Sequence, residues 1–189
     1  MDIIELLDEG YGWTAERVAA VRPEDLDLAT PCTRWDLRRL LNHMLGASGV
    51  VTDAALGVVV TPSRADPEAL AATDRIGEDP TAAFDAAATT AMTVWHTPGV
   101  LERTCSMASG ATPALVVANI NLLDVVVHGW DIAQATGEAA QIPPRLAEPI
   151  LGFARQAITE EQRRRGFAAE MATGDTASDR LVAFLGRKP

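Results

Sequence analysis

The chain has 189 residues, a length that suits one domain with a substantial hydrophobic core. Because 48% of its residues are hydrophobic and only 5% are aromatic, and strand-like runs are few, the composition favours a helical protein. The formal net charge of −10, from 16 basic and 26 acidic residues, makes nucleic acid and anionic membrane surfaces poor partners, since like charges repel.

The first part of the chain predicts two long helices. Apolar residues recur at helical spacing over residues 2–21. After the loop RPEDLDLATPC, the sequence TRWD has the pattern of a capping box, in which Thr33 accepts from a first-turn amide and Asp36 reaches back. We expect this box to open a second helix that ends near Leu56.

The next part of the chain predicts a long connection followed by a helix. Residues 61–80 are rich in proline, aspartate and alanine, and a short helix is expected within them at 67–74. A third long helix is expected over 81–96, before the sequence TPG. The stretch LERTCSMASG (101–110) is compatible with a short extended segment and with a loop.

A fourth long helix is expected from Pro113 to Thr136, with Gly137 as its stop. The segment is rich in β-branched residues, which would also suit a strand. It exceeds twenty residues without a turn signal, however, and strands seldom exceed ten. Because it is apolar nearly all round, we expect it to be the buried helix of a bundle.

Two further helices close the chain. One is expected over 142–165, with Pro149 tolerated near its first turns. The three arginines at 163–165 are interpreted as its solvated end. A short helix is expected over 176–186, and the chain is interpreted as a single domain over 1–189.

The N-terminal sequence and the cysteines predict a location. Met1 leads directly into the acidic amphipathic stretch DIIELLDEG rather than into an apolar leader, and no apolar run reaches the roughly 18 residues that span a bilayer. Cys32 and Cys105 lie far apart in the sequence. We therefore expect a cytoplasmic protein with reduced thiols.

The fourth helix carries polar residues on one face. At about 100° per residue, Asn121, Asp124, His128 and Asp131 fall within a sector of about 80°. Polar groups are costly to bury unless something satisfies them. A carboxylate and an imidazole four residues apart can converge on a metal ion, but a structural hydrogen bond would use the same pair. These residues alone leave both interpretations open.

The other histidines and one cysteine are further candidates. His43 borders the apolar side of its helix, where Gly46 and Ala47 leave space one turn on. His96 closes a helix, where a cation is favoured without any special role, and is interpreted as structural or solvent-facing. Cys32 precedes a helix N-cap, a position that can lower the pKa of a thiol, although a reactive thiol is not the favoured interpretation.

Two sequence elements resemble the DinB-like, mycothiol-dependent maleylpyruvate isomerase N-terminal superfamily. TPCTRWDLRRLLNHMLG (30–46) is similar to its first element, and LLDVVVHGWDIAQATG (122–137) to its second, an acid–x–x–x–His–x–Trp–Asp helix. The ending DRLVAFLGRKP is similar to the tail of an actinobacterial branch that is described only as metal-binding proteins. The resemblance covers essentially the whole chain.

The resemblance implies an all-α fold, a four-helix up-down-down-up bundle with additional short helices. It implies a divalent metal near one end, with His43, Asp124 and His128 as ligands. Related thiol-dependent members commonly have Glu in place of Asp124, so the shorter side chain shifts the metal or binds it through water. Asp131 would orient a ligand or a neighbouring helix terminus, and Trp130 would pack in the core.

Two histidines and one carboxylate leave coordination positions open, which is typical of catalytic metal sites. Zinc is the first expectation for the ion, with nickel or iron as alternatives. The resemblance implies mycothiol as a thiol cosubstrate, so the leading hypothesis is a thiol transferase or thiol-assisted isomerase acting on a small electrophile. The isomerase itself is less favoured because it carries a further C-terminal domain. A metal-dependent hydrolase and a non-catalytic metal- or ligand-binding bundle are the alternatives, and a homodimer is expected.

Overall fold

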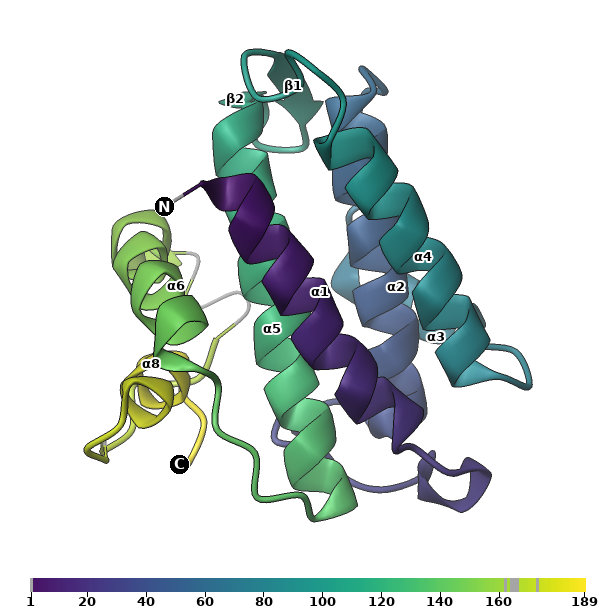
Figure 1. Cartoon of the computed structure of the whole chain (residues 1–189), viewed down its shortest axis with the longest axis vertical. Coiled ribbons are helices and arrows are strands. Elements are labelled where there is room, and N and C mark those ends of the chain that lie inside the picture. The colour runs from purple at the N-terminus through teal and green to yellow at the C-terminus, as the bar shows by residue number, and fades with distance from the viewer. Residues whose placement is uncertain (1, 162, 164–166, 173) are drawn as a thin grey trace.

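The computed structural model describes the chain except at residues 1, 162, 164–166 and 173. Its largest elements are four long helices, α1 (Ile3–Ala19), α2 (Leu37–Ala55), α4 (Pro80–Trp95) and α5 (Ala114–Thr136). In Figure 1, α1 and α5 run in one direction and α2 and α4 run in the opposite one. This is the up-down-down-up bundle that the family resemblance implied, and the all-α fold class is confirmed.

Helix α5 lies in the interior because three of its sides are covered. It contacts α1 and α2 within the bundle and α6 outside it. Two glycines permit a close approach to α1: a Cβ atom on Gly10 would meet Leu122 Cδ1 at 2.8 Å, and one on Gly129 would meet Thr14 Oγ1 at 2.6 Å. The Thr14 hydroxyl also donates to the carbonyl of Val125 at 3.0 Å. The apolar character of α5 on nearly all faces follows from this burial.

By length and composition, α5 is also able to cross a membrane. Its most apolar 18-residue window has a mean hydropathy of 1.4, so the expectation that no segment reaches this threshold is wrong. In the structure 67% of that window is buried, as in the core helix of a soluble protein.

Helix α2 begins at Leu37, three residues later than it would with Thr33 as its N-cap. Its N-cap is Asp36, whose carboxylate accepts from the amide of Arg39 at 2.8 Å. Thr33 lies in the preceding turn, and Asp36 pairs with Ala29 in an isolated β-bridge. The predicted capping box is therefore wrong, because Asp36 serves as the cap itself rather than reaching back to one.

The connection between the two halves of the bundle contains α3 (Pro67–Ala72), which is shorter than predicted. The ambiguous stretch before α5 forms a hairpin of β1 (Thr104–Met107) and β2 (Gly110–Pro113) at one end of the bundle (Figure 1). Pro113 is the N-cap of α5 rather than its first residue. Gly137 ends the helix with φ 77°, as predicted.

The C-terminal part of the chain packs beside the bundle. Here α6 (Pro144–Ala157) and α8 (Ala177–Phe184) contact each other, and α6 contacts α5 (Figure 1). The predicted helix over 142–165 is interrupted: Ile158 is extended (φ −89°, ψ 96°) and ends α6, and residues 160, 161 and 163 are helical again. Arg163 is not a solvated helix end, since it donates to the carbonyls of Ala168 and Phe184. Arg164 and Arg165 lie outside the described residues.

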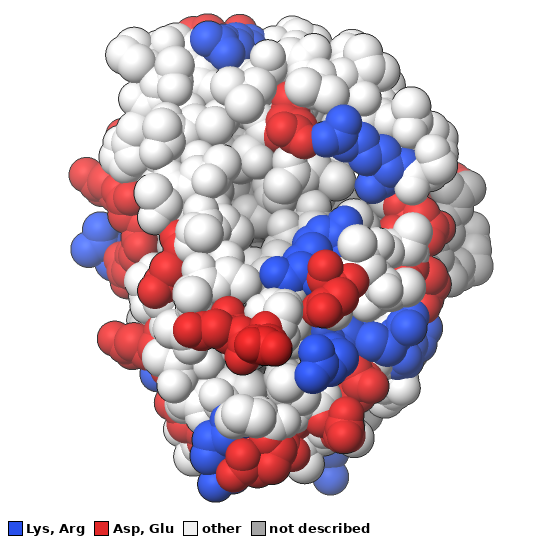
Figure 2. Space-filling model, turned by 90° about the vertical axis from the view of Figure 1, so that its right-hand side faces the viewer, with Lys and Arg blue, Asp and Glu red and all other residues white. Residues whose placement is uncertain are grey.

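The surface carries mixed charge. On the face that Figure 2 shows, acidic and basic side chains are interspersed among uncharged ones. A short 3-10 helix, η1 (Pro23–Asp25), has one such pair, in which Arg22 contacts Asp25 at 2.9 Å.

Candidate metal centre

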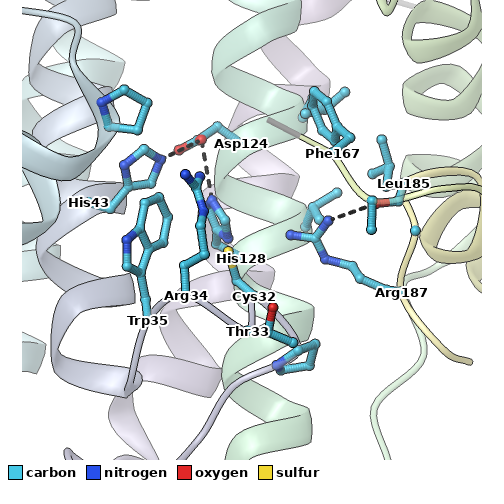
Figure 3. A pocket seen from close by; sticks show the side chains of 16 residues that line it. Cys32, Thr33, Arg34, Trp35, His43, Asp124, His128, Phe167, Leu185 and Arg187 are labelled. Atoms are coloured by element: carbon cyan, nitrogen blue, oxygen red, sulfur yellow. Dashed lines mark hydrogen bonds and ion pairs between the residues drawn. The ribbon is translucent and has the colours of Figure 1, made fainter. Parts of the chain in front are cut away.

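Three side chains from two helices of the bundle converge on one another (Figure 3). His43 comes from α2, and Asp124 and His128 come from successive turns of α5. The Nε2 atoms of His43 and His128 each lie 3.5 Å from Oδ1 of Asp124, and the three candidate ligand atoms lie within 4.8 Å of one another. The structure thus brings together the three residues that the sequence and its family resemblance single out.

The loop before α2 positions His43 through Trp35. The two rings pack with their centroids 4.4 Å apart and their planes 33° from parallel. Trp35 is held from two sides: its carbonyl accepts from the Thr30 hydroxyl at 2.8 Å, and its indole N–H donates to Glu68 at 3.2 Å. Trp35 is buried, so it serves both as a core residue and as support for the His43 ring.

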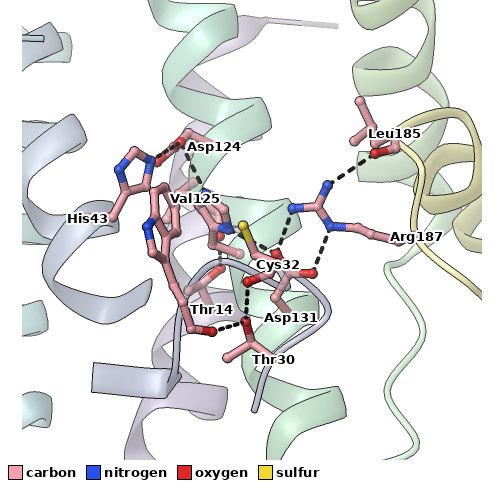
Figure 4. Close-up of polar contacts among 11 residues, drawn as sticks. Thr14, Thr30, Cys32, His43, Asp124, Val125, Asp131, Leu185 and Arg187 are labelled. Atoms are coloured by element: carbon pink, nitrogen blue, oxygen red, sulfur yellow. Dashed lines mark hydrogen bonds and ion pairs between the residues drawn. The ribbon is translucent and has the colours of Figure 1, made fainter. Parts of the chain in front are cut away.

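Asp131 contacts Nδ1 of His128, whereas Asp124 faces Nε2 on the other side of the ring; Figure 4 shows Asp131 beside Arg187. Its Oδ2 atom lies 2.9 Å from Nδ1 of His128. The guanidinium of Arg187 donates from Nε to Oδ1 and from Nη2 to Oδ2 of Asp131, both at 2.7 Å. The sequence predicted an orienting role for Asp131. It assigned no role to Arg187, although this residue lies in the family-like ending DRLVAFLGRKP, because it is 56 residues away and shares no periodic pattern with Asp131.

Electrostatics keep both carboxylates ionised. Burial raises the pKa of Asp124, but the charge of His128 and the hydrogen bond from His43 outweigh it, so this pKa lies below its ordinary value. Burial likewise opposes ionisation of Asp131, and the charge and hydrogen bonds of Arg187 overcome it to lower that pKa. The pairing in turn raises the pKa of Arg187 despite its burial. Arg187 thus offsets the charge of Asp131, and Asp124 supplies a second carboxylate anion beside the two histidines.

The donor set fits a divalent cation. Nδ1 of His43 and Oδ2 of Asp124 are buried and have no hydrogen-bond partner among the described residues. Buried polar atoms are normally satisfied, so a protein-only hydrogen-bond cluster is an incomplete account of Asp124. Two imidazole nitrogens and one carboxylate oxygen, without a thiolate, suit zinc, nickel or iron.

A cavity of about 540 Å³ opens beside the three side chains (Figure 3). Its size lies in the range of small-molecule sites. The wall combines the loop before α2, two turns of α5 and the C-terminal segment. The residues that line it are Pro31, Cys32, Thr33, Arg34, Trp35, His43, Pro67, Leu123, Asp124, Val127, His128, Phe167, Ala168, Leu185, Gly186 and Arg187.

The remaining candidates have other roles. Burial, together with the negative charge of Asp131, raises the pKa of Cys32, so the option of a lowered thiol pKa is wrong. Cys32 and Cys105 are both free. His96 is exposed and lies 3.1 Å from Asp8, as expected for a solvent-facing histidine. Trp130 is buried in the core, as predicted.

Comparison with known proteins adds a family and a shared fold. The family model for the mycothiol maleylpyruvate isomerase N-terminal domain matches residues 9–133. Uncharacterized proteins from two strains of Mycobacterium tuberculosis are 32% identical over 177 residues, which cover 92% of this chain and 91% of each relative. Crystal structures of the mycothiol-dependent maleylpyruvate isomerase and of a histidine-to-alanine mutant of it are similar with a TM-score of 0.67, at 16% and 15% identity, over 94% of this chain and 76% of theirs.

Proposed function

The chain belongs to the mycothiol maleylpyruvate isomerase N-terminal domain family, and on that premise we propose that it is a metal-dependent, thiol-using enzyme. It would bind mycothiol and transfer it to a small electrophile, or use it to isomerise one. The observation that carries this proposal is the convergence of His43, Asp124 and His128 on the wall of a cavity large enough for a small ligand.

His43, Asp124 and His128 would hold the ion, with zinc as the first expectation and nickel or iron as alternatives. A bound divalent cation supplies Lewis acidity, which lowers the pKa of a thiol and stabilises its thiolate. The short side chain of Asp124 keeps its Oδ1 atom equidistant from both histidines at 3.5 Å.

The chain's own residues favour a nucleophile supplied from outside. Cys32 is the one thiol among the residues that line the cavity, and its raised pKa keeps it protonated. The protein would instead orient and shield the reactants. Arg34 lies on the wall as a cation paired with Glu68 at 3.3 Å, while Phe167 and Leu185 present apolar surface that excludes water.

The test is calorimetry and kinetics on zinc-loaded protein. A thiol with a pKa near 8.5 is mostly protonated at neutral pH, so mycothiol binding should release about one proton per site. Its S-methyl derivative is the control and should release none. The loaded protein should also accelerate thiol attack on small electrophiles such as a chlorinated arene or an epoxide.

Two outcomes would redirect the proposal. A fully loaded protein that neither binds mycothiol nor accelerates any thiol-consuming reaction would refute the thiol-dependent function. Binding of mycothiol without turnover would instead identify a non-catalytic binding bundle.

We also propose that the protein acts in the cytoplasm as a homodimer. Support for the dimer comes from apolar side chains at the end of α2 and just beyond it: Leu56, Val58 and Val59 are 57%, 38% and 64% exposed. Light scattering at working concentration tests the dimer, and a monomeric mass would contradict it.

A further inference from the structure

The residues that follow α8 (185–189, the C-terminal segment) place the buried side chain of Arg187 behind the candidate metal centre. The side chain of Arg187 is 10% exposed, and that of Asp131 is fully buried. Their two parallel hydrogen bonds, both of 2.7 Å, form the bidentate arrangement that fixes a carboxylate most firmly. Lys188, the next residue, is exposed.

The end of α8 aims Arg187 at this position. The amide of Gly186 donates to the carbonyl of Ala183 at 3.0 Å, and that of Arg187 donates to Val182 at 2.9 Å. These two bonds, with Gly186 at φ 81°, are those of a Schellman motif. A Cβ atom on Gly186 would lie 2.7 Å from Ala168, so the turn is closely packed as well. The direction of the Arg187 side chain is therefore set by backbone structure.

The arginine acts on His128 through one shared oxygen. Oδ2 of Asp131 accepts from Nη2 of Arg187 and lies 2.9 Å from Nδ1 of His128. An ionised carboxylate can only accept, so the nitrogen that faces it carries the hydrogen. In a neutral imidazole this leaves Nε2, on the side of Asp124, as the nitrogen that carries the lone pair.

We propose that Arg187 is a positioning residue of the metal centre, which holds Asp131 so that His128 keeps the ring orientation and tautomer of a metal ligand. The inference rests on the proposed metal-binding function. It extends that function because all three ligands lie within residues 9–133, which match the family model, whereas Arg187 lies outside them. The C-terminal segment is thus part of the centre.

The first experiment measures zinc affinity by competition with a chromogenic chelator. Loss of a group that orients a metal ligand typically weakens binding by about 10–100-fold, and we expect this range for Arg187→Gln. Arg187→Lys keeps the positive charge but not the bidentate contact with Asp131, so its zinc affinity should lie between that of Arg187→Gln and that of the natural protein. Lys188→Gln removes a neighbouring exposed charge and should stay within about twofold.

A double-mutant cycle tests the route through Asp131. If Arg187 acts by holding this carboxylate, Asp131→Asn combined with Arg187→Gln should be no weaker in zinc binding than Asp131→Asn alone. Fully additive losses would overturn the proposed route.

The second experiment observes the proton directly. The chain has three histidines, so ¹⁵N-histidine labelling gives a readily assigned spectrum. The Nδ1–H signal of His128 should be sharp and protected from solvent exchange in the metal-free and zinc-loaded protein. The hydrogen behind this signal should exchange faster in Arg187→Gln and stay protected in Lys188→Gln. In Arg187→Lys it should be partly protected, and this intermediate result would show that the change in Arg187→Gln does not come from misfolding.

The two proposals fail in different ways. A natural protein that binds no divalent metal but shows the protected, Arg187-dependent Nδ1–H signal would refute the metal function and uphold the positioning contact. Normal zinc binding and an unchanged His128 signal in folded Arg187→Gln would overturn the positioning role alone.

Discussion

Two buried polar clusters lie next to each other along α5, and they differ in charge. The neutral cluster consists of Tyr11, Ser48, Trp95 and Asn121. The metal-site cluster consists of His43, Asp124, His128, Asp131 and Arg187. Asn121 and Asp124 are one turn apart on the same face of α5, so the same polar stripe serves both clusters.

The members of the neutral cluster are linked by hydrogen bonds to one another. The Tyr11 hydroxyl lies 2.6 Å from that of Ser48 and donates to Oδ1 of Asn121, which also accepts from Trp95 at 2.9 Å. Burial raises the pKa of Tyr11 to about 12, so the cluster is uncharged at neutral pH. None of its four members lines the 540 Å³ cavity.

The metal-site cluster opens onto that cavity and keeps ionised groups. Both clusters contain buried polar atoms without a partner among the described residues: Nδ2 of Asn121 in the neutral cluster, and Nδ1 of His43 and Oδ2 of Asp124 in the metal-site cluster. An orphan atom alone therefore does not identify a ligand site. The combination of an anion, converging imidazoles and an open cavity does distinguish the two clusters.

The largest expected effect is loss of metal on removal of a ligand. His128→Ala should reduce zinc content from about one ion per chain to background, because it deletes one of the three ligands. The measurement is elemental analysis of untagged, dialysed protein. His96→Ala, which alters an exposed Asp–His pair, is the matched control. Equal metal content in the two variants would show that His128 is not a metal ligand.

The next effect comes from charge alone. Asp124→Asn keeps the size of the side chain but removes the anion, so we expect zinc affinity to fall by at least about 10-fold, and any activity to follow metal occupancy. Competition titration gives the affinity, with Asp8→Asn as the exposed control. Unchanged zinc affinity would mean that Asp124 does not face the ion.

The contribution of the neutral cluster to stability should become measurable at alkaline pH. The pKa of Tyr11 is about 12 in the folded state, against about 10 when unfolded, so the unfolded state ionises first as pH rises. Stability from this group is complete below pH 10 and is lost towards pH 12, with a fall of about 1.4 kcal/mol by pH 11. Urea unfolding of the natural protein and of Tyr11→Phe isolates this contribution. Parallel pH profiles for the two proteins would contradict it.

The smallest expected effect is that of Tyr11→Phe at neutral pH. Removing the hydroxyl loses hydrogen bonds to Ser48 and Asn121, which should lower the free energy of unfolding by about 1 kcal/mol. Zinc affinity should change by less than about twofold, because the variant leaves the metal-site cluster intact. A large change in zinc affinity would show that the two clusters act as one network.

Local sequence rules predict the helices well where one signal dominates. The length and apolar character of α5 identify it as the buried helix, and helical geometry alone places its polar residues on one face. The start of α2 is mispredicted because Thr33 and Asp36 are both good caps, and their choice depends on how the preceding loop pairs. The end of α6 is missed because no glycine or proline marks the extended Ile158.

Sequence spacing predicts only those residues of the candidate site that lie on the same helix. Asp124, His128 and Asp131 share a helix face, and the family resemblance adds His43. Arg187 could not be found in this way, because its contact with Asp131 depends on how the turn after α8 packs on the rest of the chain. Contacts of this kind leave no periodic signal in the sequence.

The close approach of α1 and α5 at Gly129 affects the thermodynamics of metal binding. Thr14 and Trp13 fill the space that a side chain would need, so the turn of α5 that carries His128 is immobilised from behind. Conformational entropy at this turn is therefore lost when the protein folds, and little remains to be lost when an ion arrives. Zinc capture should accordingly proceed with a heat-capacity change near zero, in contrast to small metal domains that fold around their ion.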